Sequence, residues 1–80
     1  MKQRQDVDAS QTFDGADLLT RRELEVLKEI TDGASNKEAG RTLGISPRTV
    51  EVHRARIMEK LSARNAADLV LIVLGHPTGG

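Results

Sequence analysis

The apolar positions of the chain fall into four clusters, separated by polar segments rich in glycine, serine, asparagine and proline. In the first cluster, Val26 and Ile30 are four residues apart, which is the spacing of one face of a helix. Thr20 and Glu23 precede them at the spacing of a capping box, in which each side chain hydrogen-bonds the other residue's backbone amide. This pattern predicts a helix that begins after Thr20 and stops at Gly33.

A second, shorter helix is predicted from the same signals. Ser35 and Glu38 repeat the capping-box spacing, and Gly44 supplies the end signal. Gly40 and Leu43 lie on the inner face of this helix. Glycine weakens a helix interior by about 1 kcal/mol relative to alanine. We therefore expect Gly40 to lie where this helix and the next approach closely, because a missing Cβ allows that contact.

A third helix is predicted after Ser46, which is a good N-cap, with Pro47 at the first position, where no amide donor is needed. Residues at spacings of three and four should face inward: Val50, His53, Ile57 and Leu61. At about 100° per residue, the opposite side of the helix carries Arg48, Glu51, Val52, Ala55, Arg56 and Glu59. This second side is free to contact a partner.

The fourth helix is predicted to start after Asn65, with Asp68 at the third helical position. One stripe should face the core: Ala66, Leu69, Val70 and Val73. Leu71 and Ile72 project elsewhere, beside Asp68. Apolar residues on more than one side of a short helix indicate a second packing partner.

The second and third helices, joined by a short turn, form a helix-turn-helix, a device that places its second helix in the DNA major groove. The whole chain has a net charge of zero, but residues 36–64 carry seven Lys or Arg against three Glu. The basic excess therefore lies on the unit that would meet DNA phosphates. An ordinary solvated surface could carry the same excess, so charge alone leaves both interpretations open.

The length of 80 residues predicts one small domain. Residues 1–17 are polar and lack an apolar period, which predicts a flexible arm or linker. Phe13, the one aromatic residue, falls in this arm, so the core is expected to be aliphatic. The folded domain is predicted over residues 18–75, and residues 76–80 should form a disordered tail.

A family resemblance rests on three runs: Leu19-Thr-Arg-Arg-Glu-Leu-Glu-Val-Leu27, Ser35-Asn-Lys-Glu38 and Leu43-Gly-Ile-Ser-Pro-Arg-Thr-Val50. Together with the later residues of the third helix, they resemble the LuxR-type (GerE-type) DNA-binding domain of bacterial transcription regulators. The run from Ile45 to Arg54 is most similar to the FixJ-type branch, the output domains of two-component response regulators.

The resemblance implies an all-α, four-helix fold, with the third helix in the major groove and the fourth helix in a dimer contact on DNA. The implied base-reading positions are Glu51, Val52 and Ala55, with Arg56 and Glu59 nearby. The implied phosphate contacts are Asn36, Lys37, Ser46, Arg48, Thr49 and Lys60. The implied dimer contacts are Asp68, Leu71 and Ile72.

Several of these side chains have an alternative interpretation. Glu51 can accept a hydrogen bond from a cytosine amino group, or it can pair with Arg48 or Arg54 on the protein surface. Val52 can contact a thymine methyl group, or it can be an ordinary exposed apolar residue. Thr49 can bind phosphate or cap its own helix.

Enzyme chemistry is not expected, because the sequence shows no nucleophile–base pair, Gly-rich phosphate loop or paired carboxylates. His53 should be buried and hydrogen-bonded, and His76 lies in the tail, so neither predicts a metal site. No cofactor is expected. The chain has no apolar run long enough to span a membrane and no secretory signal, so we expect a cytoplasmic domain.

The sequence therefore predicts sequence-specific binding of double-stranded DNA by a homodimer, as the output domain of a bacterial transcription regulator. RNA polymerase is a further candidate partner of such a regulator. The alternative is a helix-turn-helix scaffold used as a protein–protein interaction module, with the apolar fourth helix as its binding surface.

Overall fold

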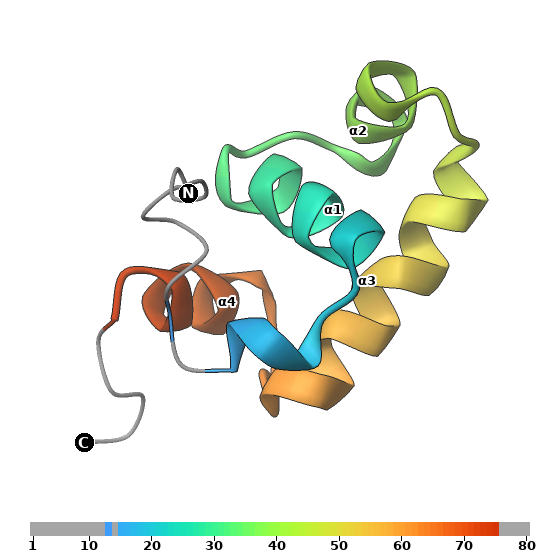
Figure 1. Cartoon of the computed structure of the whole chain (residues 1–80). Coiled ribbons are helices and arrows are strands. Elements are labelled where there is room, and N and C mark those ends of the chain that lie inside the picture. Colours follow the sequence, from blue (N-terminus) through green and yellow to red (C-terminus); the bar gives the residue numbers. More distant parts are fainter. Residues whose placement is uncertain (1–12, 14, 76–80) are drawn as a thin grey trace, which may run out of the picture.

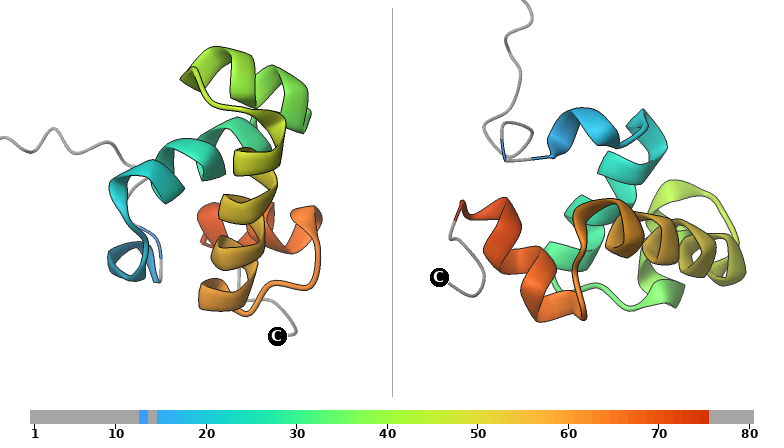
Figure 2. Two further views of the ribbon diagram at one scale, coloured as in Figure 1. Left: turned by 90° about the vertical axis from the view of Figure 1, so that its right-hand side faces the viewer. Right: turned by 90° about the horizontal axis from the view of Figure 1, so that it is seen from below.

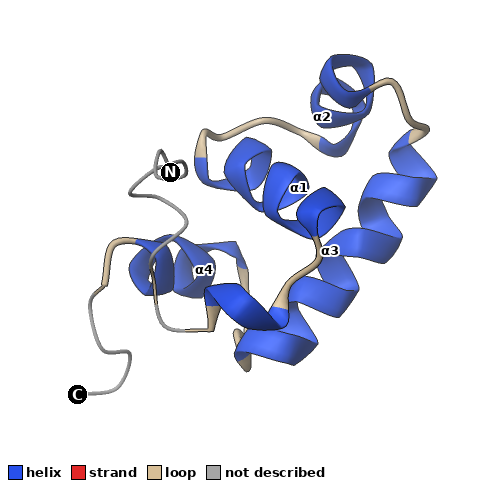
Figure 3. Cartoon of the chain, in the orientation of Figure 1, coloured by secondary structure: helices blue, strands red, loops and turns tan. Residues whose placement is uncertain are grey.

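The computed structural model describes residue 13 and residues 15–75, and within these residues all regular structure is helical (Figure 3). In the described part of the chain, a 3₁₀ turn precedes four α-helices: η2 (Ala16–Leu18), α1 (Arg21–Thr31), α2 (Asn36–Leu43), α3 (Pro47–Leu61) and α4 (Ala66–Val73). The predicted all-α, four-helix class is confirmed. The predicted tail over residues 76–80 lies outside the described residues, as do residues 1–12 and 14 of the predicted arm.

The helices pack around α1, which contacts each of the other three (Figure 1). The most extensive contact joins α2 and α3, the two helices of the predicted helix-turn-helix. In the left view of Figure 2, α3 lies in front of α1 and α4, with its outer side uncovered. This arrangement leaves one long side of α3 free for a partner.

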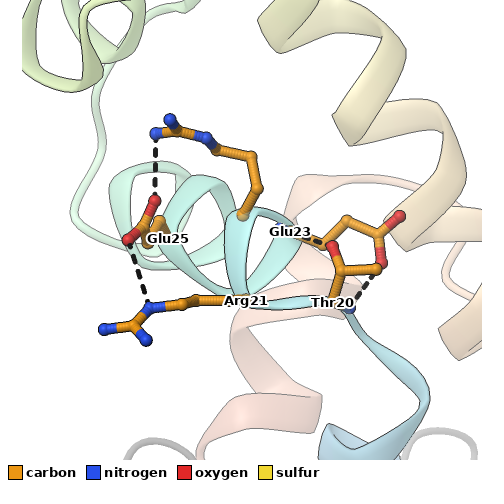
Figure 4. A network of polar contacts seen from close by, with 5 residues as sticks. Thr20, Arg21, Glu23 and Glu25 are labelled. Carbon is orange, nitrogen blue, oxygen red and sulfur yellow. Dashed lines mark hydrogen bonds and ion pairs between the residues drawn. The ribbon is translucent and has the colours of Figure 1, made fainter.

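The predicted capping boxes account for where α1 and α2 begin. The Thr20 hydroxyl accepts from the Glu23 amide at 3.1 Å, and the Thr20 amide donates to Glu23 Oε1 at 2.9 Å (Figure 4). Ser35 and Glu38 make the same two hydrogen bonds at 3.1 and 2.9 Å. Each box satisfies amides that have no partner within the helix.

The starts of α3 and α4 also follow the sequence. The Ser46 hydroxyl accepts from the Thr49 amide at 3.1 Å, and Asn65 Oδ1 accepts from the Asp68 amide at 2.9 Å. The turn between α2 and α3 opens at Gly44, whose φ of 74° is a left-handed conformation that glycine adopts without steric cost. These local contacts determine where α2 ends and where α3 and α4 begin.

The core contains an aromatic residue that was predicted to lie in the polar N-terminal arm. Phe13 is only 9% exposed and belongs to the same buried cluster as Val26, Ile57 and Leu69. The prediction of a purely aliphatic core is therefore wrong, and the packed domain begins before residue 18. A single aromatic residue in a polar segment shows no periodicity, so the pattern of apolar positions could not reveal its burial.

The close approach predicted at Gly40 is present. A Cβ atom at this position would lie 2.6 Å from the carbonyl oxygen of Ile45 and 3.3 Å from the nitrogen of Pro47. The Ile45 amide also donates to the Gly40 carbonyl at 2.9 Å. Gly40 thus lets the turn, rather than the body of α3, pack directly on α2.

The buried stripe of α4 differs by one residue from the predicted stripe. Leu69 is fully buried, and Ala66, Ile72 and Val73 pack against the core cluster. Ile72 thus takes the place that the helical period assigned to Val70. Leu71 and Leu74 remain 41% and 65% exposed. The helix therefore keeps an apolar surface after it has packed on the domain.

Candidate nucleic-acid interface

The outer side of α3 carries all five predicted base-reading residues. Val50 and Ile57, on the inner side, are fully buried and anchor the helix to the core. The side chains of the outer side are all exposed: Glu51, Val52, Ala55, Arg56 and Glu59. The structure thus brings the predicted residues together on one face of the helix.

The chemistry of this face is mixed. Val52 is 43% exposed and Ala55 is exposed beside it, which leaves a small apolar surface between charged groups. In the described part of the chain, no ion pair joins Glu51 to Arg48 or Arg54. The surface-pair alternative for Glu51 is therefore absent from the structure, and its carboxylate is available to an external donor.

The predicted phosphate contacts are divided between free and engaged side chains. Lys37 at the start of α2 and Arg48 at the start of α3 are both exposed. The hydroxyls of Ser46 and Thr49 are exposed too, but they hydrogen-bond each other at 2.9 Å. Ser46, not Thr49, caps α3. The Thr49 hydroxyl therefore hydrogen-bonds the capping hydroxyl of Ser46 and does not itself cap the helix.

Asn36 has a partner that the sequence analysis did not assign. Its Oδ1 accepts a hydrogen bond from Arg54 Nη1 at 3.2 Å, and this bond links the first turn of α2 to the middle of α3. The two residues are 18 positions apart, and no local pattern relates them. Arg54 itself is half-buried, between the inner and outer sides of α3.

Lys60 is engaged within the fold. Its Nζ lies 2.8 Å from Glu23 Oε1, where it joins the C-terminal part of α3 to the first turn of α1. The Glu23 side chain is 3% exposed and also completes the capping box of α1. In this structure the Lys60 ammonium is thus held by an ion pair within the fold, and its phosphate contact stays a prediction.

This ion pair changes the acidity of Glu23. Burial by itself raises the pKa of Glu23, but hydrogen bonds from Lys60 and Thr20 and the charge of Lys60 outweigh burial. The pKa consequently lies below the ordinary value of 4.5. A carboxylate whose pKa is lowered by folding stabilises the folded state above the unfolded-state pKa, and the contribution is lost as the pH falls through the folded-state pKa.

We expect Glu23→Gln to lower the free energy of unfolding at neutral pH by about 1–3 kcal/mol, because it removes the negative charge that strengthens the hydrogen bond from Lys60 and leaves the Lys60 ammonium without a counter-ion. The difference from the unmodified protein should begin to shrink as the pH falls below 4.5, and it should be lost once the pH falls through the lower folded-state pKa of Glu23. Urea unfolding followed by circular dichroism across this pH range measures both effects.

Glu25 provides the matched control for that substitution. It lies on the same turn of α1 but points outward, in exposed ion pairs with Arg21 and Arg22 (Figure 4). Exposed pairs contribute about 0–1 kcal/mol, so Glu25→Gln should have a small effect. Equal losses for the two variants would show that the Glu23–Lys60 pair has no special role.

The predicted dimer residues also separate into two groups. Asp68 is buried, and its Oδ2 accepts from the Arg64 amide at 2.9 Å and from Arg64 Nε at 3.1 Å. These two bonds hold the pKa of Asp68 below its ordinary value of 3.8. Ile72 packs against the core, whereas Leu71 is exposed. Of the three predicted residues, only Leu71 therefore presents an exposed side chain.

His53 differs from its prediction. It is half-buried, and its Nδ1 atom is buried without a hydrogen-bond partner in the described residues. The predicted hydrogen bond of His53 is therefore missing. Among the residues that the structure describes, no group of three or more His, Asp or Glu is placed to hold a metal ion. None of the described helices is long and apolar enough to cross a membrane.

Comparison with known proteins gives a family match over most of the chain. Residues 17–73 match the family described as bacterial regulatory proteins, luxR family. This is a family of regulatory proteins rather than of enzymes. The matched segment runs from η2 through α4 and includes the whole α2–turn–α3 unit.

Curated relatives include several transcriptional regulatory proteins. The chain is 45% identical to TdiR of Thauera aromatica over 70% of this chain and 25% of that protein. It is 47% identical to UhpA of Escherichia coli K12 over 66% of this chain and 27% of that protein. It is 44% identical to FixJ of Rhizobium meliloti over 76% of this chain and 30% of that protein.

The chain thus spans between a quarter and a third of the length of these relatives. No solved structure gives a significant match. The matched family segment coincides with the packed helices, and the relatives of the FixJ and UhpA type agree with the resemblance found in the sequence. The chain belongs to the luxR family of bacterial regulatory proteins and carries its helix-turn-helix domain.

Proposed function

We propose that this domain binds specific sequences of double-stranded DNA as the output domain of a cytoplasmic transcription regulator of the response-regulator type. The observation that carries the proposal is the uncovered outer side of α3, next to a turn and an α2 start that present basic and polar side chains. The relatives named as transcriptional regulatory proteins support it.

In this proposal α3 lies in the major groove, which is wide enough for a helix. Glu51 accepts a hydrogen bond from a cytosine amino group, and Val52 and Ala55 contact thymine methyl groups. Arg56 and Glu59 lie on the same face and contact the edges of the site. A carboxylate among these groups repels phosphate, so Glu51 contributes more to sequence choice than to affinity.

Phosphate contacts orient the domain on the duplex. Lys37 and Arg48 are exposed cations in the first turns of α2 and α3, the two helices of the helix-turn-helix. Asn36, Ser46 and Thr49 add neutral donors around them. Lys60 is left out of this set because its ammonium is paired with Glu23. Such contacts determine the register of the domain on the duplex, whereas the outer face of α3 determines which base sequence is bound.

The first test is fluorescence anisotropy with a degenerate duplex library, repeated over a range of salt concentrations and followed by sequencing of the bound fraction. Each neutralised phosphate adds about 0.9 to the slope of log affinity against log salt. We expect salt-dependent binding and enrichment of one sequence motif. Absence of binding at low salt by a folded domain would reject the proposal and favour a protein-interaction module.

We also propose that two copies bind together through α4, on an inverted repeat with half-sites roughly one helical turn, or about 34 Å, apart. The exposed apolar residue Leu71 supports this part of the proposal. Asp68 supports the contact indirectly, since it holds the start of α4 through Arg64, and Ile72 joins the same helix to the core. RNA polymerase would be a further partner of the bound dimer.

Leu71→Asp should leave the monomer folded, because Leu71 is exposed, but it should weaken binding to the inverted repeat by roughly 10-fold or more, since the second copy no longer adds avidity. Affinity for a single half-site should not change. Leu18→Asp, which alters an exposed leucine on η2, is the control. Unchanged cooperativity and unchanged self-association of the Leu71 variant would contradict a dimer through α4.

A further inference from the structure

Arg54 is the donor in its hydrogen bond with Asn36, and this determines which end of the Asn36 amide is free to bind a ligand. Arg54 Nη1 donates to Asn36 Oδ1 at 3.2 Å across the α2–α3 contact. A guanidinium group has only donors, whereas a side-chain amide has an oxygen acceptor and two N–H donors. The Asn36 oxygen must therefore face Arg54, and the amide nitrogen must face away.

This orientation leaves a group of donors with no acceptor among them. The Asn36 oxygen is occupied, so the free part of its amide is the Nδ2 nitrogen with its two N–H groups. Lys37, the next residue, is exposed and adds an ammonium group. Within the described residues, neither the Asn36 nitrogen nor Lys37 has a protein acceptor. A phosphate oxygen only accepts hydrogen bonds, so a group of unpaired donors can bind it.

We propose that Arg54 is a positioning residue for phosphate binding: it orients the Asn36 amide so that its two N–H donors face the DNA backbone. This inference rests on the proposed function and adds to it a residue outside the predicted site. Arg54 acts through Asn36 and does not itself contact the phosphate. Its half-buried position between α2 and the core-facing side of α3 agrees with that role.

The test compares Arg54→Lys, Arg54→Gln, Asn36→Ala and the double variant Arg54→Gln/Asn36→Ala. Lysine is also a donor-only side chain, so it should keep the amide orientation. Glutamine can donate or accept, so it allows the amide to turn over. The measurement is anisotropy of a fluorescein-labelled duplex of mixed sequence at several salt concentrations. Melting curves confirm that every variant is folded at the temperature of the assay.

We expect Arg54→Gln to weaken duplex binding about tenfold, the value of one charge-assisted hydrogen bond, and Arg54→Lys to bind nearly as well as the unmodified protein. In the Asn36→Ala background, Arg54→Gln should have little further effect. The salt slope should be the same for Arg54→Gln and the unmodified protein. If the Arg54–Asn36 hydrogen bond only stabilises the fold, Arg54→Gln will lower the melting temperature but leave the dissociation constant of the folded protein unchanged. That result would overturn the inference.

The side-chain NH₂ resonances of Asn36 give an independent readout. On addition of the duplex they should shift in the unmodified protein and in Arg54→Lys, but much less in Arg54→Gln.

Two further results would overturn the inference while leaving DNA binding intact. Additive losses for Arg54→Gln and Asn36→Ala would show that the two residues act separately. A salt slope reduced by about 0.9 in Arg54→Gln would show that Arg54 contacts a phosphate directly. If the unmodified, folded protein fails to bind the duplex at low salt, both this inference and the proposed function are rejected.

Discussion

Replacing Lys37 and Arg48 together by alanine should abolish most of the affinity for duplex DNA while the fold remains intact. Both side chains are exposed, and each lies in the first turn of its helix, Lys37 in α2 and Arg48 in α3. Each cation removed eliminates one charge-assisted contact, so the double variant should lose roughly 10- to 1,000-fold in affinity. The slope of log affinity against log salt should fall by about 1.8, or 0.9 for each contact.

The matched control removes the same charge from another helix. Arg21 and Lys28 are exposed residues of α1, and α1 lies behind α3 in the left view of Figure 2. The double variant Arg21→Ala/Lys28→Ala has the same net charge as the Lys37/Arg48 variant. Its salt slope should therefore stay close to that of the unmodified protein. Equal losses for the two double variants would show that only total charge matters, and would contradict phosphate binding by Lys37 and Arg48.

Truncation of Ile57 should have the largest effect on stability. Ile57 is fully buried at the centre of the core-facing side of α3, in the cluster that includes Val26 and Leu69. Replacing a buried isoleucine by alanine costs about 2–5 kcal/mol. A single small core supplies only about 3–5 kcal/mol of net stability. We therefore expect Ile57→Ala to be largely unfolded at 37 °C, with loss of the helical circular dichroism signal.

Val52→Ala is the control on the same helix. Val52 is 43% exposed, so its truncation should change the free energy of unfolding by no more than about 0.5 kcal/mol. Ile57→Val, which removes a single methylene, should cost about 0.5–1.5 kcal/mol and remain folded. Thermal and urea unfolding of the three variants gives the comparison. Similar stabilities for Ile57→Ala and Val52→Ala would contradict the assignment of the inner and outer sides of α3.

The helix starts and the outer face of α3 could be predicted from the sequence because both depend on short-range contacts. A capping box joins residues three positions apart, as Thr20 and Glu23 show. The sides of a helix follow from a period of 3.6 residues, so burial of Val50 and exposure of Val52 and Ala55 could be assigned without knowing the neighbouring helices.

The contacts between helices could not be predicted in this way. Lys60 and Glu23 are 37 positions apart, and Arg54 and Asn36 are 18 apart. Whether such side chains meet depends on the angle and distance at which two helices pack, and helical periodicity contains neither quantity. The sequence therefore assigned Lys60 only to a phosphate contact, and it assigned Arg54 only to a surface pair with Glu51.

The sequence by itself determined the four helices, their caps, the helix-turn-helix unit and the face of α3 that remains free, since each depends on residues within one or two turns. Only the tertiary structure decided that Phe13 belongs to the core, that Lys60 pairs with Glu23 and that Asn36 is oriented by Arg54. The physical reason is that burial and pairing over long separations arise from packing, which brings together groups that no local pattern connects.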